Sequence, residues 1–314
     1  MLSLGIDIDD TTLNMITKIY LQSLDGGRDL AVDTHTFGRE RPNLGVTGDY
    51  ARYTVNLESH GSYRDFRDNG VDHPEDSPFV RDLRMAIAET GGVPKGPLFD
   101  LLKLVLSEES LLNFIKKITT RGHQRSSIHY GFKIVQDLGE LQNIPYEAHI
   151  DPVSSDALGG STRLISERKL AIELADLEKI ARLKVSANGV ILRSPDGLSR
   201  ARYHVHEFWD DDLKTAPLAR QVFGAWMREH PQIPMKIIYR RPHRTGVESI
   251  VFQPDGTSRL MMSDEYGELP KLVEHFRRLR LAGRPLPCLE VLTKRQGLPI
   301  ESYQTDVSIL HKIR

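Results

Sequence analysis

Short apolar runs that end in acidic or hydroxyl side chains alternate, along this chain, with stretches of helical periodicity. The first run, Leu2 to Ile8, stops in acids, and later runs cover Phe114–Ile118 and Met235–Tyr239. Such a run is typical of a parallel strand that is buried on both faces and ends at a crevice. Because strands that alternate with helices form parallel sheets covered on both faces, the predicted fold class is α/β with a doubly wound parallel sheet.

Four helices are predicted from the spacing of their apolar residues. One follows Pro97, one carries Ile128, Phe132, Val135 and Leu138, one runs from Glu167 to about Arg182, and one runs from Pro217 to Glu229. Two further strands are predicted, near Tyr146–Ile150 and ending at Phe208-Trp209. These elements account for residues 1–20 and 98–245, which we interpret as the core domain.

The stretch that precedes Pro97 interrupts this alternation. Asn14 to Phe37 has the pattern of an extended hairpin that turns at Asp25-Gly26-Gly27. Residues 38–97 are irregular but contain scattered aromatics, and a segment of this length is too long for a plain loop. We therefore expect residues 21–97 to form a small inserted subdomain.

The C-terminal residues 246–314 have a different character from the core. They contain a hairpin signal at Pro254-Asp255-Gly256, a helical pattern with Leu272, Phe276 and Leu279, and a Pro-rich tail. Another hairpin is predicted at Pro195-Asp196-Gly197. We expect residues 246–314 to form an α+β extension.

Charge and composition restrict the classes of function. The chain has 42 Lys and Arg against 43 Asp and Glu, and its net charge of −1 gives no global sign of a nucleic-acid partner. Its one cysteine, Cys288, allows no intrachain disulfide, which fits a reducing compartment. No apolar run approaches about 18 residues, and the first residues lack a signal-peptide pattern. The expected location is the cytoplasm, with no membrane partner.

Polar residues that follow the predicted strands mark the expected site, because ligands of open parallel sheets bind beyond the carboxyl ends of the strands. In chain order the sequence offers an acid pair, a hydroxyl, a lysine near a helix start, and a second acid pair. These residues are Asp7 and Asp9 with Thr11, then Thr119, then Lys169, then Asp210 with Asp211.

This order resembles the haloacid dehalogenase-like (HAD) superfamily of phosphohydrolases. The family's first motif is a strand followed by D-x-D-x-T, here Asp7-Ile8-Asp9-Asp10-Thr11. Its second is a strand that ends in Thr or Ser, here Ile118-Thr119; its third is a lysine near a helix start, here Lys169. Its fourth is a strand that ends in paired acids, here Phe208-Trp209-Asp210-Asp211. The resemblance covers roughly residues 1–20 and 100–240 and implies a Rossmann-like core, with residues 21–97 as the cap.

The resemblance implies a role for each site residue. Asp7 attacks phosphorus and forms an aspartyl-phosphate, and Asp9 protonates the leaving oxygen and then activates water. Thr119 donates a hydrogen bond to the phosphoryl group, and Lys169 neutralises its charge. The expected Mg²⁺ ligands are Asp7, Asp9, Asp210 and Asp211. The acid at position 9 also favours phosphoryl transfer over cleavage of carbon–halogen bonds.

The charges support this interpretation independently of the family. A phosphomonoester dianion is repelled by a carboxylate nucleophile, so the site must supply positive charge. Mg²⁺ and one lysine together contribute +3, which balances −2 from the phosphate and −1 from the nucleophile. An oxygen-rich set of ligands without a Cys or His cluster suits Mg²⁺.

Several alternatives stay open at this stage. The basic cluster Arg240–Arg244 is consistent with a phosphatase that acts on nucleotide or nucleic-acid ends, and a non-catalytic HAD-like binding module is a third hypothesis. The pair His204 and His206 is interpreted as structural. The favoured partner is a small phosphorylated substrate, which four insert arginines are available to attract; its identity and the oligomeric state are not predicted. These arginines are Arg64, Arg67, Arg81 and Arg84.

Overall fold

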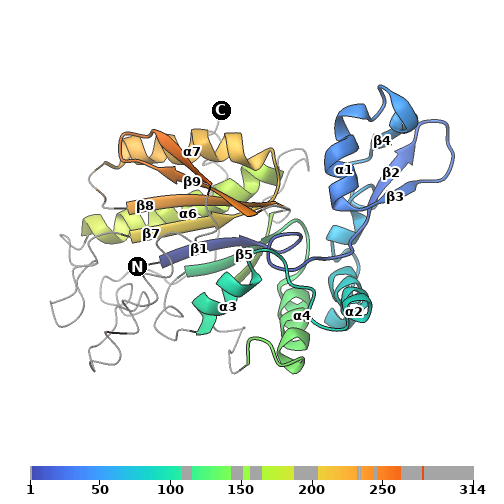
Figure 1. Ribbon diagram of the computed structural model, residues 1–314, viewed down its shortest axis with the longest axis horizontal. Helices are drawn as coiled ribbons and strands as arrows, with labels where there is room; N and C mark the ends of the chain where they lie inside the picture. Colours follow the sequence, from blue (N-terminus) through green and yellow to red (C-terminus); the bar gives the residue numbers. More distant parts are fainter. Residues whose placement is uncertain are drawn as a thin grey trace.

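The computed structural model describes residues 2–107, 115–142, 151–155, 165–186, 204–231, 233, 235–243, 246–262 and 278. Its centre is a seven-stranded sheet in the order β10-β9-β8-β7-β1-β5-β6 (Figure 1). The strands are β1 (Leu2–Asp7), β5 (Ile115–Thr120), β6 (Asp151–Ser154), β7 (His204–Trp209), β8 (Met235–His243), β9 (Gly246–Phe252) and β10 (Ser258–Met262). The strands from β6 to β8 run parallel, whereas β9 and β10 are antiparallel.

Helices cover both faces of this sheet, which confirms the predicted α/β class. The sheet, predicted as parallel, is mostly parallel, because β9 and β10 are antiparallel. On one face, α3 (Phe99–Ser107) and α4 (Arg125–Asp137) pack against Leu4 and Ile6 of β1. On the other face, α6 (Ile165–Ser186) and α7 (Thr215–Glu229) pack against Phe208 and Tyr239 (Figure 1). None of the described helices is long and apolar enough to span a membrane.

The C-terminal hairpin extends the core sheet. The predicted turn at Pro254-Asp255-Gly256 joins β9 to β10, with Gly256 in the left-handed region at φ 81°. However, the expected boundary between residues 245 and 246 divides the antiparallel pair of β8 and β9. Residues 246–262 therefore continue the central sheet. Their apolar residues Ile250 and Phe252 pack against α7 in the same core.

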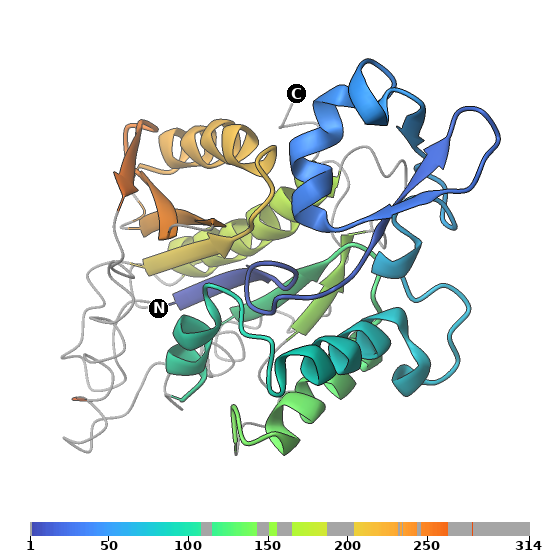
Figure 2. The same cartoon turned by 45° about the vertical axis from the view of Figure 1, so that its right-hand side comes forward.

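The insert contains a small sheet of its own (Figure 2). Its strands are β2 (Ile19–Ser23), β3 (Leu30–Val32) and β4 (Tyr53–Val55), and they lie in the sheet in the order β3-β2-β4. Helix α1 (Thr34–Glu40) follows β3 along the chain. The antiparallel pair of β2 and β3 confirms the predicted hairpin between Ile19 and Val32, whereas Phe37, its predicted last residue, belongs to α1. A separate apolar cluster forms beneath it from Ile19, Leu21, Val32, Phe37 and Tyr63.

One helix within the stretch expected to be irregular belongs to the main core. Helix α2 (Pro78–Thr90) begins after Ser77, whose hydroxyl accepts a hydrogen bond from the Val80 amide. It is followed by Gly91, which caps the helix in the left-handed region at φ 71°. Its buried Phe79 and Leu83 join the apolar cluster that includes α3 and α4. The Ser-Pro start and the Gly end are ordinary helix signals, so this helix was readable from the sequence.

Three predictions lie outside the described residues. They are the strand at Tyr146–Ile150, the hairpin at Pro195-Asp196-Gly197, and the helix with Leu272, Phe276 and Leu279. The described strand β6 begins at Asp151, the residue after the first of these segments.

A layer of buried polar side chains separates β1 from α6. Glu173 of α6 lies so close to Gly5 of β1 that a Cβ atom at Gly5 would stand 2.1 Å from a Glu173 carboxylate oxygen. Among the described residues, neither Glu173 oxygen has a hydrogen-bond partner. Burial, with the negative charge of Asp176, raises the pKa of this carboxyl well above its usual value. Glycine at position 5 therefore makes room for a buried acid.

The same layer continues onto the neighbouring strands. Lys117 of β5 pairs with Asp176 at 2.7 Å, and both side chains are buried. His206 of β7 lies 2.7 Å from the Ser3 hydroxyl, and its Nε2 lies 3.5 Å from Glu173. Burial, with the positive charge of Lys117, lowers the pKa of His206 to about 3. The interpretation of His206 as a structural residue agrees with this environment.

We predict that Gly5→Ala destabilises the protein by about 1–3 kcal/mol, because the methyl group collides with the fully buried carboxylate of Glu173, which must then shift. The measurement is the free energy of unfolding in urea. Gly38→Ala is the matched control, since a Cβ at Gly38 of α1 meets nothing within 4 Å. Equal stabilities of Gly5→Ala and the wild type would contradict this packing.

A second prediction concerns pH. His206 is neutral in the folded state, whereas an unfolded histidine titrates near 6.5, so its contribution is present above pH 6.5 and is lost as pH falls towards 3. The difference in unfolding free energy between the wild type and His206→Asn should shrink by about 1.4 kcal/mol from pH 7.5 to 5.5. A difference that stays constant, or grows on acidification, would mean that His206 is charged beside Glu173.

Candidate active site

The carboxyl ends of three adjacent strands form the site. Asp7 ends β1 and is the register partner of Thr119 on β5. On the other side, Ile6 is the register partner of Trp209, and Asp210 and Asp211 follow directly. The parallel register thus places residues that are far apart in the sequence side by side.

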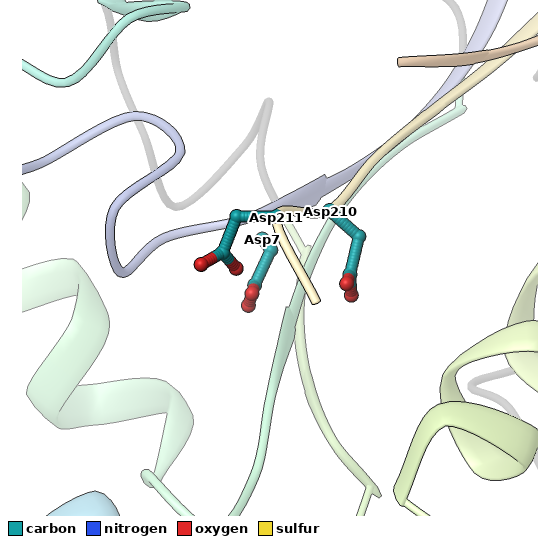
Figure 3. Close-up of side chains that lie close together, drawn as sticks. All are labelled: Asp7, Asp210 and Asp211. Carbon is teal, nitrogen blue, oxygen red and sulfur yellow. The ribbon is translucent and has the colours of Figure 1, made fainter. Parts of the chain in front are cut away.

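Three carboxylates converge at this edge of the sheet. Oxygen atoms of Asp7, Asp210 and Asp211 all lie within 4.8 Å of one another, and the side chains point the same way from the ends of β1 and β7 (Figure 3). The carboxylate of Asp9, which the sequence also suggested as a metal ligand, is not part of this trio among the described residues.

Lys169 provides the positive charge next to the trio. It lies in the first turns of α6, and its Nζ is 2.8 Å from Asp7 Oδ2 and 2.8 Å from Asp210 Oδ2. Burial lowers the pKa of this ammonium group, but the charges of Asp210 and Asp7 outweigh burial and raise it above its usual value. The neighbouring Arg168 points elsewhere, with its guanidinium 3.5 Å from the Ser155 carbonyl. The structure therefore brings the predicted lysine to the site.

The trio has more negative charge than Lys169 can neutralise. Burial raises the pKa of Asp210 to about 6 even though Lys169 opposes the shift. Burial, with the charges of Asp7 and Asp210, raises the pKa of Asp211 well above its usual value. Three ionised carboxylates and one ammonium group have a net charge of −2. The ligand atoms that the three acids offer are all oxygen atoms. This set fits a hard divalent cation such as Mg²⁺.

Asp9 is half-buried in a tight turn after β1, and both of its carboxylate oxygens are buried. The amides of Thr12 and Leu13 both donate to the Ile8 carbonyl, and Asp10 adopts a left-handed conformation with φ 54°. Neither carboxylate oxygen of Asp9 has a hydrogen-bond partner among the described residues. Burial, with the charges of Asp10 and Asp211, raises the pKa of Asp9 well above its usual value. This environment favours the protonated form of Asp9, the form that can donate a proton.

Thr119 is fully buried beside Asp7. Within the described part of the chain, its hydroxyl donates a single, long hydrogen bond of 3.4 Å, to the Ile6 carbonyl. A hydroxyl with so weak a partner can reorient to donate to a ligand at the strand ends.

The insert contacts the core at two points next to the site. The Thr34 hydroxyl, at the start of α1, donates to Asp10 Oδ2. On the other side, the backbone of Arg67 forms an isolated β-bridge with Gly122, in the loop after β5. In the same loop, His123 Nδ1 lies 2.8 Å from the Asp68 carboxylate. The insert is thus connected to the loops that carry the first two motifs.

Two arginines of the basic cluster after Tyr239 are paired with acids of neighbouring strands. Arg240 is buried and forms a bidentate ion pair with Glu207, with distances of 2.6 and 2.8 Å. Arg241 pairs with Glu248. These partners lie on neighbouring strands, so the sequence near Arg240 gave no sign of them.

We predict that Mg²⁺ stabilises the protein. At about 100 times its dissociation constant, a bound cation adds about 2.7 kcal/mol, or roughly 5 °C or more in Tm. Asp211→Asn should abolish this shift and leave the metal-free Tm at or above the wild-type value, because it removes charge repulsion. Asp25→Asn, in the exposed β2–β3 turn, is the control that should respond to Mg²⁺ as the wild type does. An equal Mg²⁺ shift in Asp211→Asn would place the cation elsewhere.

No family model, curated protein or solved structure matches this chain. Its motifs and its geometry are therefore the two sources from which a function can be inferred. They agree on the residues, since the segments that carry the motifs contribute Asp7, Lys169, Asp210 and Asp211.

Proposed function

We propose that this protein is a Mg²⁺-dependent phosphohydrolase of the HAD-like superfamily, which cleaves a phosphomonoester through an aspartyl-phosphate intermediate. The observation that carries the proposal is the contact of Lys169 with both Asp7 and Asp210, with Asp211 adjacent. A lysine and three carboxylates, drawn from separate segments in the family's motif order, are the groups that phosphoryl transfer requires.

The proposed reaction uses Asp7 and Asp9 in two steps. A carboxylate oxygen of Asp7 forms a bond to phosphorus while the ester P–O bond breaks, and Asp9 gives its proton to the leaving oxygen. The ionised Asp9 then takes a proton from water, whose oxygen attacks phosphorus and releases phosphate and Asp7. The raised pKa of Asp9, caused by desolvation of its carboxylate and by the neighbouring acids, suits the first step, in which an acid is required.

The other groups bind and neutralise the phosphoryl group. Asp7, Asp210 and Asp211 would hold Mg²⁺, which supplies a Lewis acid that offsets phosphate charge. Lys169 stabilises the negative charge that accumulates on the phosphoryl oxygens, and Thr119 donates a hydrogen bond to one of them. In this role Lys169 keeps its contact with the nucleophile and directs the remaining protons of its ammonium group to the substrate.

The part of the insert from β2 to about Asp68 serves as the cap in this proposal. Its small apolar cluster is separate from the main core, and its contacts with Asp10 and with the loop after β5 lie next to the site. A cap in this position limits the access of water and selects the leaving group.

A small substrate is favoured over a nucleic-acid end. The pairing of Arg240 with Glu207 and of Arg241 with Glu248 removes two charges that a phosphate backbone would need. A non-catalytic binding module would not require a buried acid at position 9, whose ionisation the surrounding carboxylates oppose. Hydrolysis of small esters is therefore the activity to test first.

We predict that Asp7→Asn abolishes turnover and leaves no phosphoenzyme, because an amide is not a nucleophile towards phosphorus. Asp9→Asn should still form phosphoenzyme from an activated aryl phosphate, whose leaving group needs little protonation, but should hydrolyse it at least 100-fold more slowly. Rapid-quench trapping with labelled substrate and Mg²⁺ measures both species. Asp25→Asn, on the exposed turn of the insert, is the matched control.

Two outcomes would contradict this division of roles. Normal turnover by Asp7→Asn would remove the aspartyl-phosphate mechanism. Full loss of phosphoenzyme in both variants, with Mg²⁺ binding intact, would mean that Asp9 acts before or during the attack on phosphorus and not mainly afterwards. If the wild-type protein hydrolyses no phosphate ester, the phosphatase proposal is wrong and the binding-module hypothesis remains.

A further inference from the structure

The polar layer between β1 and α6 contains two buried groups that face each other without a hydrogen-bond partner. Among the described residues, no partner exists for either carboxyl oxygen of Glu173 or for Nε2 of His206. Glu173 Oε2 lies 3.5 Å from His206 Nε2, at the outer limit of hydrogen bonding, and neither side chain is more than 1% exposed. Because an unpaired buried polar group is unfavourable, the contact indicates a proton between these two groups.

One proton on Glu173 would satisfy both groups. His206 Nδ1 lies 2.7 Å from the Ser3 hydroxyl, which can accept a hydrogen bond from it. In a neutral imidazole with hydrogen on Nδ1, Nε2 is an acceptor. A protonated Glu173 has an O–H group that can donate to this nitrogen after a small approach. An ionised Glu173 would present only acceptors to it.

The surrounding charges favour Glu173 as the group that carries the proton. Burial, and next the charge of Asp176, raise the pKa of Glu173 well above its usual value. Burial, and next the charge of Lys117, lower the pKa of His206 to about 3. The charged side chains around Glu173 come from α6, from β5 and from the ends of β1 and β7; they are Lys169, Asp176, Lys117, Asp7 and Asp210.

Glu173 lies one helical turn from the lysine of the candidate active site. Lys169 and Glu173 are four residues apart on α6, so their Cβ atoms are about 5–6 Å apart on one helix face. On β1, Gly5 and Asp7 are two residues apart and share one strand face. Lys169 contacts Asp7 at 2.8 Å, and the Glu173 carboxyl packs on Gly5. The two contacts between α6 and β1 are therefore neighbours.

An ionised Glu173 would compete with Asp7 for the lysine. The ammonium group of Lys169 already lies 2.8 Å from Asp7 and 2.8 Å from Asp210. A third carboxylate one turn away would attract it away from the nucleophile, and its charge would also repel a phosphate dianion. A neutral Glu173 has neither effect.

We propose that Glu173 is a positioning residue for Lys169: as a neutral acid that donates its proton to His206, it leaves the ammonium group to Asp7 and Asp210. Lys117 and Asp176 pair at 2.7 Å, so the layer beneath the lysine then has no net charge. This inference rests on the proposed function, because it gives Glu173 a part in the reaction that Lys169 assists.

The kinetic test measures kcat against pH for an activated aryl phosphate with Mg²⁺. The leaving group of this substrate needs little protonation, so the loss of the Asp9 proton does not limit the alkaline side. Glu173→Gln cannot ionise, but its amide can donate to His206, and its kcat at pH 7 should stay within about twofold of the wild type. Above neutral pH the wild-type kcat should fall as Glu173 loses its proton, whereas Glu173→Gln should keep its kcat to a pH about one unit higher or more.

Two further variants complete the kinetic test. Glu173→Leu has no donor for His206 and should lower kcat by about tenfold with little change in KM. Glu178→Gln is the matched control on α6, since Glu178 accepts a hydrogen bond of 3.0 Å from Trp226 and an amide oxygen can do the same. The control should follow the wild-type profile. An identical alkaline limb in the wild type and Glu173→Gln, or a tenfold loss of kcat in Glu173→Gln at pH 7, would overturn the inference.

An infrared measurement separates this inference from the proposed function. Without substrate or Mg²⁺ at pH 7, the difference spectrum between the wild type and Glu173→Gln should contain the carbonyl stretch of a protonated carboxylic acid. If this band is present but the wild type hydrolyses no ester, the phosphatase assignment fails, and Glu173 is a neutral acid without a part in turnover. If the spectrum contains only the bands of an ionised carboxylate, the inference is wrong even where the wild type is an active phosphatase.

Discussion

The double ion pair of Lys169 is the contact on which the arrangement of the site depends. One ammonium group holds carboxylates from the ends of two neighbouring strands, and all three groups are largely removed from water. A buried carboxylate without a partner is very unfavourable, so the lysine determines how closely Asp7 and Asp210 can approach. A lysine in the first turns of a helix also faces the positive end of the helix dipole. Its position is therefore favourable only because both carboxylates are present.

The polar layer below this contact explains how α6 is oriented. Lys169, Glu173 and Asp176 recur at spacings of four and three and occupy one helix face, directed at Gly5, Lys117 and His206 of the sheet. Rotation of α6 would separate Lys117 from Asp176 and leave two buried charges unpaired. Apolar residues on the adjacent face, among them Leu170 and Leu177, supply most of the burial, and the polar face selects one orientation.

The residues that the sequence located well are those whose signals are local. Asp7, Thr119 and Asp210 each end a predicted strand, and parallel strands that end at one edge necessarily bring such residues together. Other features depend on partners far along the chain, as in the pairing of Arg240 with Glu207 or the attachment of β9 to β8. The cap boundary was blurred for the same reason, because the apolar face of α2 packs on α4 and only the tertiary fold reveals this.

The distribution of charge separates two tasks. In the proposed reaction, a divalent cation and Lys169 would balance the nucleophile and one phosphate dianion near the strand ends, so the inner site would have no positive charge left for a second anion. Acidic groups beyond it, among them Asp10 and Asp212, would repel a leaving group that is itself anionic. A substrate with two anionic ends therefore needs cations further out.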